Sequence, residues 1–215
     1  MERDDVYNLQ YKEIKVVKAK RTHILTQLYL YREISIAKVA TELKLKEAIV
    51  KQFIQFLIQD LILRGHYKKG TFVVSNFYKY PIISKKKLTE LQIIILGTLI
   101  PLPKMKVSEL ANICIISKEK IKDNLTDLVK YGYFAGYISK GYINSIKIEQ
   151  LDKKEKISDE DIFIIGTCMM RRKAILAEVA KDTGIKREKV LYSIAKLLLN
   201  GKLEAKIQLE TGFLS

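Results

Sequence analysis

Three copies of one helical pattern follow one another along the 215-residue chain, and this repetition limits the possible folds more than any other feature. Each copy contains a short apolar segment that ends in a small residue: Ala40, Ala111 and Ala180. Further along, each copy reaches a glycine, and the intervals between these glycines are 67 and 69 residues: Gly65, Gly132 and Gly201. We call the copies the first, second and third repeats. They predict tandem copies of one small domain.

The clearest helix in each repeat lies between the alanine and the glycine. Apolar residues recur there at spacings of four and three, which keeps one face of a helix apolar. These residues are Val50, Ile54 and Leu57; Ile121, Leu125 and Leu128; and Val190, Ile194 and Leu197. Counted from Ala40 to Gly65, the helix of the first repeat is predicted to be four residues longer than its counterparts, about one turn.

Each repeat also opens with a helix and closes with a predicted hairpin. The opening helices are expected over residues 22–32, 87–100 and 158–170, and Ser158 is placed to cap the last of them, ahead of three acidic residues. After each long helix the apolar period changes toward two, over 66–74, 133–148 and 202–214. A further glycine stands where each hairpin must turn: Gly70, Gly141 and Gly212.

An opening helix, a short helix, a longer helix and a two-stranded wing make up a winged-helix domain. We therefore predict a mainly α protein with small β-wings (α+β), built of three tandem winged-helix domains. The expected boundaries are an N-terminal extension at 1–20 and domains at 21–80, 81–150 and 151–215. The first junction contains aromatic residues and a proline, whereas the second is charged, so we expect the first to be the more rigid.

The end of the third repeat resembles the winged-helix part of PCI domains, which occur in scaffold subunits of the proteasome lid, the COP9 signalosome and translation initiation. The similarity lies in the run from Leu197 through Gly201, Ala205 and Ile207 to Gly212. Winged helices of ESCRT-II subunits and of the ubiquitin-fold-modifier ligase close with similar tails. This resemblance implies a role in assembling protein complexes.

Composition excludes several classes of function. Two cysteines and two histidines, without metal-ligand spacing, leave too few soft ligands for a zinc site, and no nucleophile or phosphate-loop motif is present. We therefore expect neither an enzyme nor a metal or cofactor site. No apolar stretch is long enough to span a bilayer, and the first residues do not look like a signal peptide. We expect an intracellular protein, cytoplasmic or, if it binds DNA, located at the nucleoid or nucleus.

The net charge of +15, from 39 Lys and Arg against 24 Asp and Glu, favours an anionic partner. Winged-helix DNA binders need cations at the start of the third helix and along the wing. The candidates with these positions, or in the basic run of the third repeat, are Lys46, Lys51, Lys68, Lys69, Lys118, Lys120, Lys122, Lys140, Arg171, Arg172, Lys173, Lys186, Arg187 and Lys189. Lys predominates over Arg, which favours phosphate contacts over base reading. Binding to nucleic acid, with DNA favoured, is the leading hypothesis.

Two other interpretations remain open. Basic helix faces are commonly just solvated surface, and a Lys-rich composition alone produces them. The chain could instead be a subunit of a larger protein assembly, because the third helix of the first repeat carries more apolar residues than one core needs. Phe53 and Phe56 on this helix are the candidate protein-binding residues. Tyrosines in the second wing could stack on bases, but they also suit cross-strand pairs in a hairpin.

Overall fold

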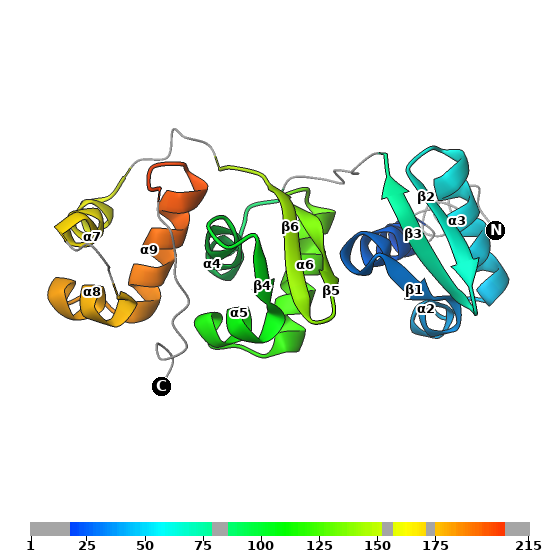
Figure 1. Ribbon diagram of the computed structural model, residues 1–215, viewed down its shortest axis with the longest axis horizontal. Helices are drawn as coiled ribbons and strands as arrows, with labels where there is room; N and C mark the ends of the chain where they lie inside the picture. The colour runs from blue at the N-terminus through cyan, green and yellow to red at the C-terminus, as the bar shows by residue number, and fades with distance from the viewer. Residues whose placement is uncertain (1–17, 79–85, 152–156, 171–174, 205–215) are drawn as a thin grey trace, which may run out of the picture. The chain divides into compact units, whose positions relative to one another are not determined.

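The computed structural model describes residues 18–78, 86–151, 157–170 and 175–204 (Figure 1). These residues form α-helices and small antiparallel sheets, as the sequence predicted in outline. The chain divides into two compact units, Met1–Ile83 and Ser84–Ser215. The first unit contains the first repeat, and the second unit contains the other two.

The first unit places three helices beside one small sheet. Residues 18–31 are helical, and the elements that follow are β1 (Glu33–Ser35), α2 (Ile36–Leu43), α3 (Glu47–Gln59), β2 (Leu63–Lys68) and β3 (Thr71–Phe77). The strands are antiparallel in the order β1-β3-β2. The hairpin expected over 66–74 is therefore present, but β1 adds a third strand that the sequence reading missed.

The second repeat has the same order of elements. They are α4 (Glu90–Leu99), β4 (Lys104–Lys106), α5 (Val107–Cys114), α6 (Lys118–Lys130), β5 (Phe134–Ser139) and β6 (Tyr142–Ile148). The sheet again has a short first strand next to the last one, in the order β4-β6-β5. Such three-residue strands are too short to show a convincing period of two, which explains why both were missed.

The third repeat is described as three helices: α7 (Asp159–Met170), α8 (Leu176–Thr183) and α9 (Arg187–Leu199). Ser158 caps α7 as predicted, because its hydroxyl accepts a hydrogen bond from the Asp161 N–H at 3.1 Å. The hairpin expected over 202–214 lies almost wholly outside the described residues.

Both described hairpins turn through two residues with positive φ, namely Lys69 and Gly70, and Lys140 and Gly141. Two positive φ values define the tight turn whose twist matches that of the strands. In each case the carbonyl oxygen of the glycine then accepts a hydrogen bond from the first residue of the short helix, Ile36 at 3.0 Å or Val107 at 2.9 Å. The hairpin tip is thereby tied to the start of α2 or α5.

The predicted core positions of the long helices point inward. Side chains at eight of the nine positions are buried, and Ile194 is partly buried against the core formed by Ile164, Val179 and Val190. At about 25 cal/mol per Å² of apolar surface, these side chains supply much of the stability of each small core. The apolar spacing in the sequence therefore identified the correct helix faces.

The extra turn predicted for the long helix of the first repeat is wrong. α3, α6 and α9 all contain 13 residues. Gly65 does not end α3. It lies within β2, at a bulge where a Cβ would come within 2.4 Å of the Val73 oxygen, and its structural counterpart is Gly136 in β5. The residue that matches Gly132 and Gly201 is Leu61, which also has a positive φ and also lies 21 residues after the alanine.

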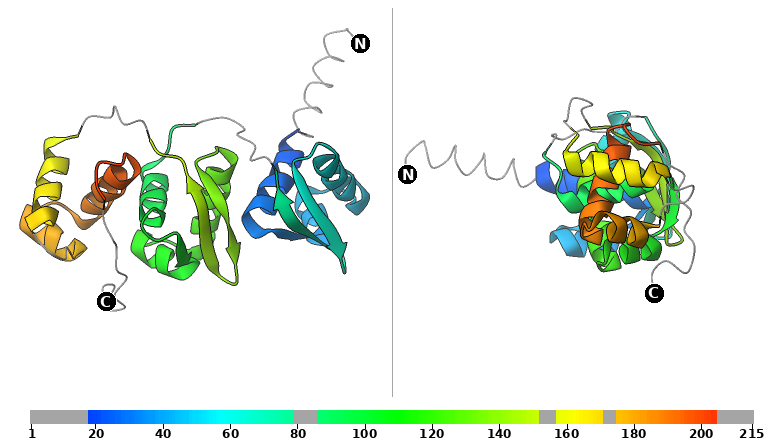
Figure 2. Two further views of the ribbon diagram at one scale, coloured as in Figure 1. Left: turned by 45° about the horizontal axis from the view of Figure 1, so that its top comes forward. Right: turned by 90° about the vertical axis from the view of Figure 1, so that its left-hand side faces the viewer.

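The second and third repeats pack directly on each other within the second unit. α4 and α9 lie side by side in Figures 1 and 2, and they cross so closely that a Cβ on Gly97 would come within 2.5 Å of the Ala195 backbone. α4 is apolar all round because α9 covers the side that α5 and α6 leave open. The expectation that the second junction is the looser one is therefore wrong.

Candidate nucleic-acid interface

The first turns of α6 carry three of the predicted lysines. Ser117 caps the helix by accepting a hydrogen bond from the Lys120 N–H at 3.2 Å. Lys118 and Lys120 are exposed, whereas Lys122 is half-buried. In the part of the chain that the structure describes, none of these three ammonium groups has an ion-pair partner. The lysines add to the partial positive charge of the helix N-terminus, so this end of α6 suits an anion.

A second basic group surrounds Tyr142, at the tip of the second hairpin. β4 alternates with a period of two, which exposes Lys104 and Lys106 and buries Met105. The ammonium groups of both lysines lie over the Tyr142 ring, 5.6 Å and 5.8 Å from its centre. Lys140 is exposed in the turn that precedes β6. We call Lys104, Lys106, Lys140 and Tyr142 the hairpin cluster.

From this cluster, the sequence had indicated Lys140 as a cation candidate and Tyr142 as one of the wing tyrosines that could stack on bases or pair across the hairpin. Lys104 and Lys106 were missed because β4 itself was missed, and the alternation Lys-Met-Lys just before a short helix was the available signal. Register then explains the contact, since Lys106 is paired with Tyr142 across the sheet. Tyr133, another tyrosine of the second wing, donates a hydrogen bond to the Lys86 carbonyl oxygen at 3.0 Å.

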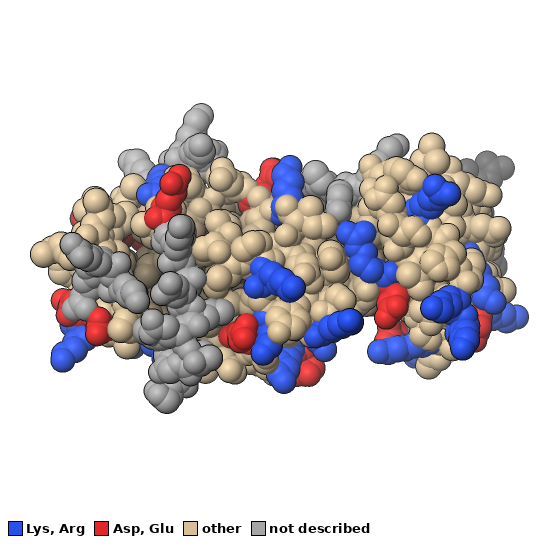
Figure 3. All heavy atoms as spheres, in the orientation of Figure 1, with Lys and Arg blue, Asp and Glu red and all other residues tan. Residues whose placement is uncertain are grey.

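On the face drawn in Figure 3, Lys and Arg side chains gather around the lower end of the second sheet, with a few Asp and Glu side chains among them. Within the hairpin cluster itself, Lys106 has a weak ion pair with Glu109 at 3.9 Å. Such an exposed pair contributes little, so this lysine can turn to another anion at small cost.

The same positions in the first unit have a different chemistry. Lys46, Lys51, Lys68 and Lys69 are exposed as predicted, but β1 carries Glu33 and Ser35 where β4 carries lysines. The residues match through the shared register, in which Ser35 pairs with Thr71. Figure 3 shows Lys and Arg side chains at the lower end of the first unit too, but its described residues include no pair of edge-strand lysines like Lys104 and Lys106.

The two phenylalanines proposed for protein binding differ in exposure. Phe53 is partly buried, whereas 41% of Phe56 is exposed on the outer side of α3. The neighbouring exposed positions of α3 are mostly glutamines. This surface is neither strongly basic nor strongly apolar.

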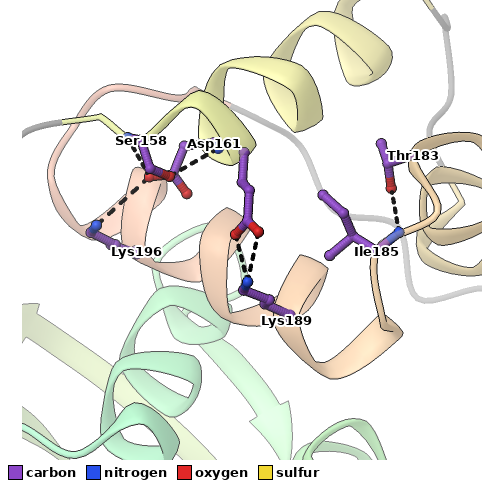
Figure 4. Close-up of polar contacts among 7 residues, drawn as sticks. Ser158, Asp161, Thr183, Ile185, Lys189 and Lys196 are labelled. Carbon is purple, nitrogen blue, oxygen red and sulfur yellow. Dashed lines mark hydrogen bonds and ion pairs between the residues drawn. The ribbon is translucent and has the colours of Figure 1, made fainter.

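In the third repeat, one of the predicted lysines has an ion-pair partner. Lys189 on α9 donates a hydrogen bond to Glu160 on α7 at 2.7 Å and so joins two helices of the same repeat (Figure 4). The pair is exposed, and the assignment of Lys189 as a phosphate ligand stays a prediction. Lys186 is exposed and Arg187 half-buried, while Arg171, Arg172 and Lys173 lie outside the described residues.

A buried polar contact lies beside this pair. Asp161 is 2% exposed, and its carboxylate accepts a hydrogen bond from the Ser158 N–H at 3.0 Å and lies 3.7 Å from the Lys196 ammonium. Burial raises the pKa of Asp161, but the hydrogen bonds from Ser158 and Ser193 and the charge of Lys196 outweigh it, so its pKa is lowered. This carboxylate is structural, because it fixes the start of α7 against α9.

The described residues include no group of three or more His, Cys, Asp or Glu side chains arranged to hold a metal ion. Burial raises the pKa of the Cys114 thiol to about 12, and it raises that of Cys168 as well. Both thiols therefore stay protonated at neutral pH and are weak nucleophiles. Among the described helices, none has both the length and the apolar character required to cross a membrane.

No known protein family matches the sequence, and none of the curated proteins is similar to it.

Proposed function

We propose that the chain is a non-enzymatic tandem winged-helix protein that binds nucleic acid, with duplex DNA the favoured partner, chiefly through its second repeat. The order of elements in the first two repeats, with a long third helix followed by a tied hairpin, supports the winged-helix part of this proposal. The three helices of the third repeat, α7, α8 and α9, follow in the same order as α4, α5 and α6 of the second. A transcription or chromatin role is the corresponding biological setting.

The observation that carries the proposal is the hairpin cluster together with the lysines of α6. Four lysines belong to the two elements that contact DNA in winged-helix binders, the third helix and the wing: Lys118, Lys120, Lys122 and Lys140. Lys104 and Lys106 lie beside the wing, on the strand that pairs with β6. Compact ammonium groups on long stems bind phosphate oxygens as point charges. The Tyr142 ring adds an apolar surface between the cations that can lie against a sugar or base.

Binding of this kind tolerates sequence variation, because phosphate contacts position a protein on the duplex without reading base edges. α6 carries no arginine or glutamine for bidentate base recognition, and the amide of Asn124 donates a hydrogen bond to the Lys120 carbonyl oxygen of the same helix at 2.7 Å. We therefore expect similar affinity for duplexes of different sequence and a strong dependence on salt.

A triple variant tests the hairpin cluster directly. Replacing its lysines (Lys104→Ala, Lys106→Ala and Lys140→Ala) removes up to three phosphate contacts, so the slope of log affinity against log salt should become shallower by about 2 to 3. The matched control removes three exposed lysines of the first unit (Lys46→Ala, Lys68→Ala and Lys69→Ala) and should change the slope by less than half as much. Equal effects of the two triple variants would contradict the assignment to the second repeat.

A second candidate function is a subunit role in a protein assembly. It is favoured by the exposed ring of Phe56 and by the close packing of α4 on α9, which demonstrates that helices of this chain dock on neighbouring domains. Partners recovered from the source cell should then survive nuclease treatment and high salt. If Phe56 is a contact, Phe56→Asp should release them without lowering the melting temperature.

A further inference from the structure

The α7 helix exposes an apolar face that is unusual for a helix in a folded domain. Its members are Ile162, Phe163, Gly166, Met169 and Met170, which we call the Gly166 face. Measured from Gly166, the other four lie at the positions three and four residues before and after it, so all five share one side of the helix. Their exposed fractions are 57% for Ile162, 54% for Phe163, 79% for Met169 and 91% for Met170. This side of α7 is thus apolar and uncovered.

Gly166 occupies the same position in α7 as Gly97 does in α4. Each glycine is the eighth residue of its helix, and each helix starts with a reciprocal cap, from Thr89 and Gln92 in α4 or from Ser158 and Asp161 in α7. A threonine follows both glycines and donates a hydrogen bond to the carbonyl oxygen four residues earlier. The two helices are therefore equivalent residue by residue.

In α4, the face equivalent to the Gly166 face is covered by α9. The backbone of α9 at Ala195 lies so close to Gly97 that a Cβ on Gly97 would have no room. Leu198 and Leu199, three and four residues beyond Ala195, are buried on the same helix. At Gly166, in contrast, a Cβ would meet nothing within 4 Å. The face of α7 has the glycine that allows a helix to approach closely, but none of the helices in the described residues lies against it.

We propose that the Gly166 face is a docking site for a helix of a partner protein that resembles α9, with a small residue at the crossing point and aliphatic residues three and four positions later. Two methionines at one end of the face suit such a partner, because their flexible side chains adapt to the surface that they contact. This inference goes beyond the proposed nucleic-acid function and does not depend on it.

A second copy of this chain is a poorer occupant than a different protein. The α9 helix of a second copy is already covered by its own α4. The residues that match Ala195 are Thr126 in α6 and Gln55 in α3, and the residues four positions beyond these are Lys130 and Gln59. The residues three positions beyond, Val129 and Ile58, are aliphatic, but neither helix combines a residue as small as alanine with two aliphatic residues, as α9 does. The partner therefore carries its own α9-like helix.

The test uses the full-length protein and a fluorescent peptide with the sequence of residues 186–201, held helical by a side-chain crosslink on the face that α4 does not cover. The crosslink removes the cost of forming an isolated helix, which would otherwise mask weak binding. We expect saturable binding to the wild-type protein. Gly166→Leu should weaken it at least tenfold, by the roughly 1.4 kcal/mol that corresponds to a tenfold change. A peptide with Ala195→Leu should lose binding similarly.

Several outcomes would overturn the proposal. Absence of peptide binding to the wild-type protein is one. Equal binding to the Gly166→Leu protein is another, because the peptide would then be displacing α9 from α4. Dimerisation of the wild-type protein that Gly166→Leu abolishes would assign the face to a second copy. Gly166→Leu should also melt no lower than wild type, since the added side chain enters open space, and a lower melting temperature would show that the face is already occupied.

Discussion

The first and second repeats share one backbone plan and differ in the surface built on it. Both have a 13-residue third helix, a bulge at a glycine in the first hairpin strand, and a hairpin tip tied to the short helix. The edge strand, however, carries Glu33 and Ser35 in one repeat and Lys104 and Lys106 in the other. The residues shared by both repeats maintain the fold, and the residues that differ are where separate functions can arise.

Net charge alone favours the first repeat over the second, for which we propose nucleic-acid binding. Residues 1–80 carry a formal charge of +7, against +5 for residues 81–150. The edge strand β1 of the first repeat nevertheless carries no lysine, whereas two lysines of β4 lie over the Tyr142 ring in the second. What matters for binding an anion is where the charges converge, because interactions between exposed charges fade within about 10 Å at moderate salt.

The largest expected effect is that of charge reversal on α6. Lys118→Glu, Lys120→Glu and Lys122→Glu should weaken duplex binding about 100-fold at low salt, because attraction to phosphate becomes repulsion. The measurement is a titration of labelled duplex followed by anisotropy, with circular dichroism to verify folding. The matched variant in the first repeat, Lys46→Glu, Lys51→Glu and Lys68→Glu, should cost much less. A larger loss for this second variant would reverse the comparison.

Asp161 and Gln92 occupy the same capping position in the third and second repeats, and only Asp161 titrates. Asp161→Asn should destabilise the protein by about 1 to 3 kcal/mol at neutral pH, by removing charge-assisted hydrogen bonds. Because the pKa of Asp161 is lowered by folding, its stabilising effect is present above its ordinary value of 3.8 and is lost as the pH falls through the lower, folded value.

Denaturant melts of both proteins at several pH values measure this difference. The gap between wild type and Asp161→Asn should narrow in acid. A gap that is constant with pH would show that the charge of Asp161 is not what stabilises α7.

Introducing the residues of the hairpin cluster into the first repeat tests the same difference between the repeats by a gain of binding. Glu33→Lys, Ser35→Lys and Thr71→Tyr recreate it in the first repeat and should raise duplex affinity about fivefold, since two phosphate ligands are added and an acid is removed. The control is Glu33→Gln, Ser35→Gln and Thr71→Tyr, which adds the ring without the cations. Equal affinities of the two variants would mean that the lysines are not phosphate ligands.

The smallest effect concerns the residue that ends the long helices. Leu61 has a φ of 52°, in the left-handed region that glycine adopts freely, whereas Gly132 has a φ of 76° at the same position of the second repeat. Leu61 is also exposed, so little packing would be lost by removing it. Leu61→Gly should therefore stabilise the first unit by up to about 1 kcal/mol, and Gly132→Leu should destabilise the second. Denaturant melts measure both changes, and stabilisation by Gly132→Leu would refute the equivalence of the two positions.

Much of the fold could be predicted from the sequence because helix periodicity and turn glycines are local signals. The core positions of the long helices, the cap at Ser158 and the turns at Gly70 and Gly141 were all identified this way. The alignment of Gly65 with Gly132 failed because glycine serves two purposes here, one at a helix end and one at a strand bulge. Composition cannot distinguish these uses.

The site was harder to predict because its parts are brought together by pairing across a sheet. Lys106 and Tyr142 are 36 positions apart in the sequence, and only the register of β4 on β6 makes them neighbours. Likewise, Lys189 looked like a free cation at the start of a helix until its partner Glu160 on another helix was located. A single side chain's environment depends on long-range contacts that a local pattern does not contain.

The dependence of duplex affinity on salt tests the central claim most directly. If the six lysines of α6 and the hairpin cluster all contact phosphate, wild-type affinity for a short duplex of mixed sequence should fall with a log–log slope of about −5. Alanine substitution of the hairpin lysines should reduce this slope in proportion. Undetectable binding at the lowest salt, or an affinity that does not change with salt, would contradict the assignment of this surface to nucleic acid.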